Sequence, residues 1–160
     1  MTPRRVSRAT RAVLPIPHQD DAILLDEITL VAADRLEARV LVRAGTAFSD
    51  ADGNLPAWVG PEIMAQAISA LAGKRSLAAH GRPAAIGLLL GVRSYAAPGG
   101  DFRCGETLRV EVVESSEDEE GRAVFDCTIS RAGERLASGA LTVYQPLDDT
   151  FLESECARDD

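Results

Sequence analysis

The stretch Gly53–Lys74, with the sequence GNLPAWVGPEIMAQAISALAGK, predicts a long helix that the rest of the chain encloses. Four apolar side chains recur along it at helical spacing: Met64, Ala67, Ile68 and Leu71. The opposite side carries only small or polar side chains, namely Glu62, Ala65, Gln66 and Ser69. A helix of this composition fits inside a core, where a carboxylate such as that of Glu62 is rarely found without a partner.

Two prolines limit where this helix begins. Proline is tolerated in the first helical turn, where its missing N–H has no partner to lose. We therefore expect the regular helix to begin near residues 57–60, after Pro56 and with Pro61 in its first turn. Gly73 and the segment AAHGRP at residues 78–83 are expected to end it.

Segments of strand length precede and follow the helix. An apolar run at 22–31 and an alternating segment at 35–43 are close enough in the chain to form a hairpin. After the helix, a nearly continuous apolar run at 84–95 is typical of a central strand that is covered on both faces. Alternating segments then lie at 106–115, 121–129 and 135–145, with an acidic solvated turn at 115–121 and a tight turn at 132–134.

This order of elements predicts an α+β fold, in which an antiparallel sheet wraps round one long central helix. Such a sheet has open edges, and natural proteins cover or pair open edges. Pairing through a two-fold axis is the commonest solution, so we expect a dimer.

Composition limits the class of protein. The chain has 160 residues and 46% hydrophobic composition, which suits one domain, assigned here to residues 14–146. Residues 1–13 are expected to form a basic tail and residues 147–160 a polar one. The net charge of −8 argues against nucleic acid as a partner, because neutralising phosphates needs a basic surface. No apolar run has the length of a membrane span or of a secretory signal, so we expect a cytoplasmic protein.

The cysteines and the short motifs indicate no metal and no cofactor. Cys104, Cys127 and Cys156 have neither the spacing of zinc ligands nor the even number of a disulfide framework. Cys127 lies in an alternating strand, where it is expected to be a small buried hydrophobe. Neither a phosphate-binding loop of the Walker type nor a Gly-x-Ser-x-Gly nucleophile elbow is present.

Glu62 is the candidate for acid–base chemistry. A helix N-terminus favours its ionised form, whereas apolar surroundings favour the protonated form. A carboxyl under these opposing influences can take up and release a proton, although an ordinary first-turn acid is the alternative. Gln66 lies one turn later on the same face and could orient the carboxyl or a substrate. Of the two histidines, His80 is expected to be exposed in a turn, and His18 precedes the first strand.

Four segments, taken in order, resemble a known family. They are LPIPHQDDAILLDEI, LPAWVGPEIMAQAISALAG, IGLLLGVRSYAA with FRCGETLRVEV, and LASGALTVYQP, between residues 14 and 146. Together they resemble the hot-dog 3-hydroxyacyl-acyl carrier protein dehydratases, and most closely the predicted dehydratase branch associated with aryl-polyene and xanthomonadin-type pigment clusters. The resemblance implies the hot-dog fold and elimination of water from a 3-hydroxyacyl thioester.

The resemblance also implies roles for individual residues. His18 matches a Pro-His loop before the first strand, and Glu62 matches the catalytic carboxylate of the central helix. The better-known relatives carry their catalytic histidine in a Gly-His-Phe-Pro loop before that helix, where this chain has Asp50 and Asp52 instead. We therefore expect His18 to be the base and Glu62 the acid. Further expected contacts to the substrate come from Val59, Gly60, Gln66 and Gly91.

The implied partner is an acyl chain on carrier protein or coenzyme A. Carrier proteins are acidic, so docking on this acidic chain needs local cations, for which Arg93 and Arg103 are candidates. A homodimer and a heterodimer with another hot-dog protein are both open. Two other functions also stay open at this point: an acyl thioesterase, and a non-catalytic subunit that binds acyl thioesters or a partner dehydratase.

Overall fold

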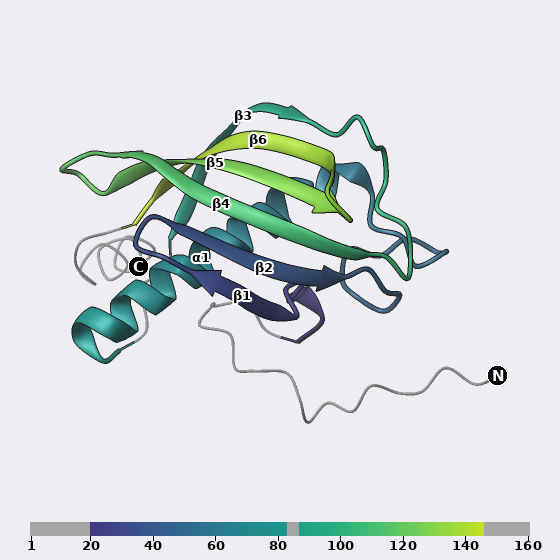
Figure 1. Cartoon of the computed structure of the whole chain (residues 1–160), viewed down its shortest axis with the longest axis horizontal. Coiled ribbons are helices and arrows are strands. Elements are labelled where there is room, and N and C mark those ends of the chain that lie inside the picture. The colour runs from purple at the N-terminus through teal and green to yellow at the C-terminus, as the bar shows by residue number, and fades with distance from the viewer. Residues whose placement is uncertain (1–19, 83–86, 146–160) are drawn as a thin grey trace, which may run out of the picture.

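A six-stranded antiparallel sheet curves round a single long helix in the computed structural model, which describes residues 20–82 and 87–145 (Figure 1). The predicted tails, 1–13 and 147–160, lie outside the described residues. The elements in chain order are a 3₁₀ turn at Asp20–Ala22, β1 (Glu27–Val31), β2 (Arg35–Leu41), a 3₁₀ turn at Ala57–Val59, α1 (Gly60–His80), β3 (Leu88–Ala96), β4 (Thr107–Glu117), β5 (Arg122–Arg131) and β6 (Glu134–Tyr144).

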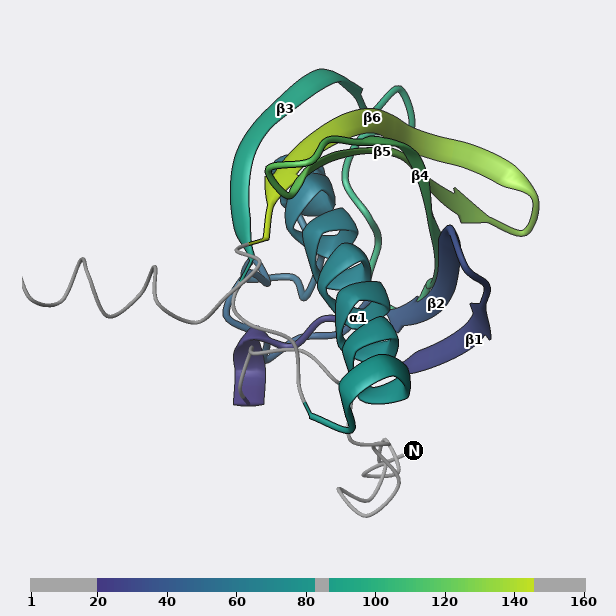
Figure 2. The ribbon, with the colours of Figure 1, turned by 90° about the vertical axis from the view of Figure 1, so that its left-hand side faces the viewer.

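The strands lie in the order β1-β2-β4-β5-β6-β3, so that β1 and β3 form the two edges of the sheet. Figure 2 shows the sheet curling round α1, which runs along its concave side. This is the predicted α+β architecture, a sheet wrapped round one central helix.

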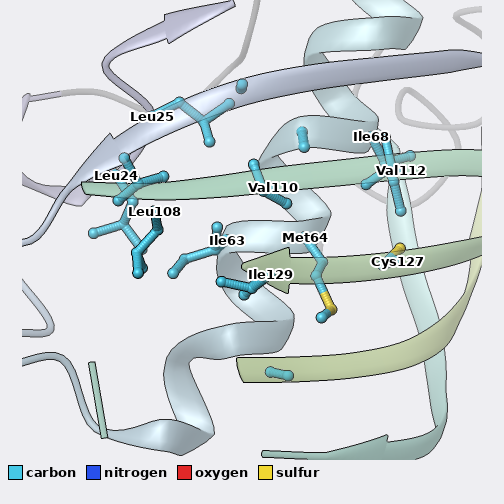
Figure 3. Close-up of a cluster of buried hydrophobic side chains, with 14 of the residues drawn as sticks. Leu24, Leu25, Ile63, Met64, Ile68, Leu108, Val110, Val112, Cys127 and Ile129 are labelled. Carbon is cyan, nitrogen blue, oxygen red and sulfur yellow. The ribbon is translucent and has the colours of Figure 1, made fainter. Parts of the chain in front are cut away.

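The core lies between α1 and the concave face of the sheet (Figure 3). The helix contributes Ile63, Met64 and Ile68, each at most 5% exposed. They pack with Leu108, Val110 and Val112 of β4 and with Cys127 and Ile129 of β5. The alternation predicted for these strands is confirmed, because every second residue is buried while the residues between them are more exposed.

Prolines mark the start of the helix, and a glycine marks its end. Pro56 precedes the 3₁₀ turn, and Pro61 lies in the first turn of α1, as expected. The expectation that Gly73 ends the helix is wrong, because Gly73 is buried within α1. The helix ends at His80, where Gly81 takes a left-handed φ of +68° that glycine adopts without strain. His80 is exposed, as predicted.

Two predicted strands differ from the structure. In the apolar run at 22–31 only Glu27–Val31 is a strand, while Leu24 and Leu25 are buried ahead of it without strand pairing. The segment at 84–95 is not a central strand, because among the described strands β3 pairs with β6 alone and lies at the sheet edge. Its apolar side chains are therefore uncovered: Leu88, Leu89, Leu90 and Val92 are 40–53% exposed.

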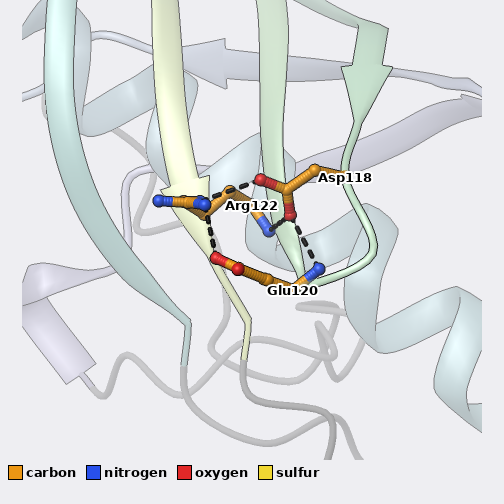
Figure 4. A network of polar contacts seen from close by, with 3 residues as sticks. All are labelled: Asp118, Glu120 and Arg122. Atoms are coloured by element: carbon orange, nitrogen blue, oxygen red, sulfur yellow. Dashed lines mark hydrogen bonds and ion pairs between the residues drawn. The ribbon is translucent and has the colours of Figure 1, made fainter.

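The acidic turn between β4 and β5 is closed by its own charges (Figure 4). Asp118 accepts the backbone N–H groups of Glu120 and Arg122, each at 2.9 Å, and the Arg122 Nε at 2.8 Å. These hydrogen bonds, those from Arg122 first, lower the pKa of Asp118. Because residues 115–120 are exposed, the prediction of a solvated turn is confirmed, although β4 continues further into it than expected.

Glu37 is a buried carboxylate on the outer face of the sheet. It is only 9% exposed, because the guanidinium of Arg109 lies against it and donates from Nε at 3.0 Å. This hydrogen bond from Arg109 lowers the pKa of Glu37, so the carboxylate stays ionised at neutral pH. The alternation of β2 puts Glu37 on the face opposite the core, and it is the contact with Arg109 that accounts for the burial of Glu37.

The β5–β6 hairpin gives a test of the backbone. Its two turn residues, Ala132 and Gly133, have φ angles of +48° and +83°, which suit a type I′ turn. Alanine is strained there, whereas asparagine adopts this region more readily. Ala132→Asn should therefore raise the free energy of unfolding by about 0.5–1 kcal/mol, measured by urea denaturation. Ala132→Val, the matched control, should lower it, and the opposite order would contradict the assigned turn.

Candidate functional site

The start of α1 places Glu62 in the first helical turn, where its side chain is partly buried. Pro61 immediately before it contributes no backbone N–H, and the 3₁₀ turn Ala57–Val59 leads directly into the helix. The positive end of the helix dipole therefore lies beside the carboxyl. This arrangement agrees with the predicted location of the acid at the helix start.

Gln66 is the most completely buried polar side chain of the site, at 0% exposure. Its amide nitrogen donates to Glu62 Oε1 at 3.1 Å and to the backbone oxygen of Ala22 at 2.8 Å. Its amide oxygen accepts the backbone N–H of Leu24 at 2.9 Å. The amide of Gln66 thus joins the carboxyl of Glu62 to the segment that leads into β1.

These contacts separate the two roles that the sequence left open for Gln66. Both hydrogens of its amide are used by protein acceptors, and the side chain has no exposed surface. The contacts favour orientation of the Glu62 carboxyl over direct contact with a substrate. A substrate-binding role stays a prediction.

His18, the predicted base, lies outside the described residues. It precedes Ala22 by four positions in the chain, and Ala22 is bonded to Gln66. The structure therefore describes the expected acid, Glu62. It also describes the hydrogen bond between Gln66 and Ala22, which follows the expected base, His18, in the chain.

Val59 and Gly60 lie beside Glu62, as the sequence predicted, but their backbone N–H groups already have acceptors. Val59 donates to the oxygen of Pro56 at 2.9 Å, and Gly60 donates to the oxygen of Ala57. A thioester oxygen would have to share or replace these hydrogen bonds. Their role in binding the substrate stays a prediction.

The loop that lacks the relatives' histidine is held by its own side chains. Asp50 Oδ1 accepts the backbone N–H groups of Asp52 and Asn54, each at 2.9 Å. The Asn54 side chain in turn accepts the N–H of Cys104 at 2.9 Å. The Asp50 carboxylate therefore stabilises the conformation of the loop. These hydrogen bonds give no support for Asp50 as a replacement for the catalytic histidine of the relatives.

The remaining predicted residues lie on exposed surface. Gly91 and Arg93 belong to the edge strand β3, and Arg103 follows in the loop before β4. All three are exposed. A role for Gly91 in substrate binding and for the two arginines in carrier docking stays a prediction.

Two residues that hold the helix start were missed from the sequence. The hydroxyl of Tyr95 donates to the backbone oxygen of Ala57 at 2.6 Å, and Asp101 accepts the N–H of Ala57 at 2.8 Å. No sequence pattern predicts these contacts, because they join segments about forty residues apart in the chain. They depend on the path of the backbone after β3.

Other reactive groups do not gather at this site. Cys127 is 2% exposed, as predicted, and burial raises the pKa of its thiol to about 12, with Asp126 adding to the effect. Within residues 20–82 and 87–145, no group of three or more histidine, cysteine, aspartate or glutamate side chains is placed to hold a metal ion. The described helices include none that is long and apolar enough to cross a bilayer.

Comparison with known structures gives a strong match. The structure described as the dehydratase heterocomplex ApeI:P from Xenorhabdus doucetiae matches with a TM-score of 0.80 and 30% identity, covering 89% of this chain and 95% of the other. AziG from S. sahachiroi matches with a TM-score of 0.57 and 17% identity over 75% of this chain and 90% of its own.

A hypothetical thioesterase from Streptococcus pneumoniae, solved with coenzyme A, has a TM-score of 0.58 and 14% identity, covering 74% and 86% of the two chains. At this identity the likeness shows the fold alone, which is the hot-dog fold. A comparison with curated proteins found no match. The family described as ApeP-like, ApeP dehydratase, matches residues 12–153. The chain belongs to the ApeP-like dehydratase family.

Proposed function

We propose that this protein eliminates water from a 3-hydroxyacyl thioester to give the trans-2-enoyl thioester, on an acyl carrier protein or coenzyme A, in fatty-acid or polyene biosynthesis. The observation that carries the proposal is the hydrogen-bonded connection through Gln66. It joins the Glu62 carboxyl to the backbone that follows His18 in the chain. Membership of a dehydratase family supports the reaction class.

In the proposed reaction His18 takes a proton from C2 of the acyl chain. The electron pair of that C–H bond forms the C2–C3 double bond while the C3–O bond breaks. The Glu62 carboxyl gives its proton to the departing hydroxyl, which leaves as water. Proton transfer from His18 back to Glu62 through solvent restores both groups.

The order of residues in the chain supports the pairing of these two residues. His18 comes four positions before Ala22 in the sequence. Ala22 is hydrogen-bonded to Gln66, which also contacts Glu62. We propose on this basis that the imidazole of His18 and the carboxyl of Glu62 act on adjacent carbons of one substrate.

Binding of the carrier is proposed to use local positive charge. The chain is acidic overall, with a net charge of −8, and an acidic carrier would be repelled by most of its surface. Arg93 and Arg103 are both exposed, in the edge strand and in the loop that follows it. We propose these two arginines as the carrier contacts.

We further propose that a second hot-dog subunit pairs with the open edge of β3. Among residues 20–82 and 87–145, β3 pairs with β6 alone, and the side chains of Leu88–Leu90 and Val92 are exposed. An edge that is both apolar and unpaired is a liability in an isolated chain and an interface in an assembly. The similar structure from Xenorhabdus doucetiae is described as the dehydratase heterocomplex ApeI:P, which favours a heterodimer over a homodimer.

The acid and the base are tested by Glu62→Gln and His18→Ala. Each should lower kcat for a 3-hydroxyacyl thioester of acyl carrier protein on the order of 10²–10⁴-fold, because each removes a group that transfers a proton. Formation of the enoyl thioester is measured for the full chain, alone and with its hot-dog partner. Glu117→Gln and His80→Ala are the matched controls, since both residues are exposed and distant in sequence from the site.

Full activity in both Glu62→Gln and His18→Ala would sink the proposed roles. Release of free acid and free thiol without enoyl product would point to a thioesterase. Turnover that depends on the partner alone, and is unaffected by either variant, would identify this chain as the non-catalytic subunit.

The connecting role of Gln66 is tested by Gln66→Met, which keeps the length of the side chain and removes its hydrogen bonds. The backbone groups of Ala22 and Leu24 would lose their partners, so the free energy of unfolding should fall by about 1–3 kcal/mol. The kcat of dehydration should fall as well, because the Glu62 carboxyl loses a donor. Ser69→Ala on the same helix is the control, and a Gln66→Met protein with unchanged stability and kcat would contradict this role.

The proposed subunit interface is tested by Leu90→Lys, at the most exposed of the four apolar β3 side chains. The charge should disfavour pairing, so sedimentation velocity should show a shift toward monomer and weaker co-purification with a second hot-dog chain. Leu77→Lys is the matched control, since Leu77 is 43% exposed on the far part of α1. Dissociation by Leu77→Lys and not by Leu90→Lys would place the interface elsewhere.

A further inference from the structure

Tyr95 is the one residue of β3 that turns inward. The other residues of Leu88–Ala96 are exposed, whereas Tyr95 is partly buried against the core. The register between β3 and β6 shifts between Arg93 and Ala96, and Ser94 has a left-handed φ of +57°. A non-glycine residue in this conformation marks local strain, which here accompanies the change in direction of the next side chain.

The inward side chain ends at the start of α1. The Tyr95 hydroxyl donates to the backbone oxygen of Ala57 at 2.6 Å, and that oxygen also accepts the N–H of Gly60. The ring lies against Gly139 of β6. A Cβ atom at Gly60 would be 1.9 Å from the Tyr95 hydroxyl oxygen, so glycine is what leaves room for this contact.

The same segment holds the other side of Ala57. Asp101 accepts the Ala57 N–H at 2.8 Å, and Leu55 pairs with Phe102 through two backbone hydrogen bonds. The first turn of a helix lacks intrahelical acceptors for its own N–H groups and is easily frayed. The turn before α1 has two hydrogen bonds of its own, from Val59 to Pro56 and from Gly60 to Ala57. The contacts from residues 95–102 add to these bonds and join the turn to the sheet.

Tyr95 remains a hydrogen-bond donor throughout the physiological range. Burial raises the pKa of its hydroxyl above the ordinary value, so the proton is retained. Gln66 holds the end of the Glu62 side chain, and the contact of Tyr95 holds the backbone that leads into Glu62. The first contact is made within α1 to Glu62 itself, and the second is made from β3 to Ala57 in the turn before it.

We propose that Tyr95 is a positioning residue for the reaction, which holds the turn Ala57–Gly60 and thereby the Glu62 carboxyl in place relative to the edge strand. The inference rests on the proposed function, in which Glu62 transfers a proton. Because Tyr95 belongs to β3, this contact would couple the position of the Glu62 carboxyl to the strand proposed as the subunit interface.

Tyr95→Phe tests the inference, because it removes the hydrogen bond and keeps the ring. In the full chain with its partner, kcat for a 3-hydroxybutyryl thioester of acyl carrier protein should fall roughly tenfold, since small misplacements of a catalytic group are costly. KM should stay unchanged, and amide hydrogen exchange at Trp58–Met64 should become faster. Tyr144→Phe is the matched control, because Tyr144 is the only other tyrosine of the chain and lies on β6.

A double variant tests whether Gly60 and the Tyr95 hydroxyl act through the same contact. A Cβ atom at Gly60 would lie 1.9 Å from the hydroxyl oxygen and 2.7 Å from Cζ of Tyr95, so Gly60→Ala should displace the whole ring and break its hydrogen bond to Ala57. Adding Tyr95→Phe to Gly60→Ala should then cause no further loss of kcat. A full additional tenfold loss would overturn the inference. If Gly60→Ala does not fold, the single variant Tyr95→Phe decides.

Failure of this inference can be told apart from failure of the proposed function. Tyr95→Phe with wild-type kcat overturns the inference alone when Glu62→Gln is inactive, even if the melting temperature falls. A fully active Glu62→Gln overturns the proposed function. The exchange measurement needs no turnover, so unchanged protection of Trp58–Met64 in Tyr95→Phe overturns the inference even in a chain without activity.

Discussion

A polar side chain on an enclosed helix must find all its partners inside the protein, and Gln66 meets this constraint. Its amide has no exposed surface, and each of its hydrogen-bonding groups contacts the chain. Leaving such groups unpaired would cost about 1–3 kcal/mol each, so the segment Ala22–Leu24 is fixed against α1. That segment begins at the end of a 3₁₀ turn and is not a strand, and Leu24 together with the next residue, Leu25, is buried in the core. The hydrogen bonds that complete the core therefore also determine where Glu62 points.

The sequence predicted the covered part of the fold well, because burial on one face leaves a period in the side chains. Leu108, Val110 and Val112 alternate with polar residues, as do Phe125 and Cys127. The same logic failed for β3, whose continuous apolar run suggested cover on both faces. The pattern of apolar residues indicates that a strand is shielded from water. It does not indicate whether the surface that covers the strand belongs to the same chain. In this structure the cover is absent within the described residues of the chain.

The candidate site was predictable only in part. Glu62 and Gln66 are separated by one helical turn, so their contact follows from the sequence alone. The contact of Tyr95 with Ala57 does not, because it requires the strained backbone at Ser94 and the room left by Gly60. Neither feature has a pattern in the sequence. Serine does not usually adopt a left-handed conformation, so the sequence does not predict one at Ser94. The need for glycine at position 60 becomes clear only when the nearby side chain of Tyr95 is known.

The start of α1 and the turn before it are held by contacts from two different parts of the chain. The segment Ala22–Leu24 is bonded to Gln66 inside the described fold, so this side is present in a single chain. The other side is Tyr95, which belongs to the edge strand with its uncovered apolar residues. A strand with a free edge opens more readily than one paired on both sides, because fewer hydrogen bonds hold it. A subunit that pairs with β3 would therefore steady Tyr95, and with it the turn before Glu62, without touching the carboxyl. In the proposed assembly, pairing at β3 would thus influence dehydration through this turn.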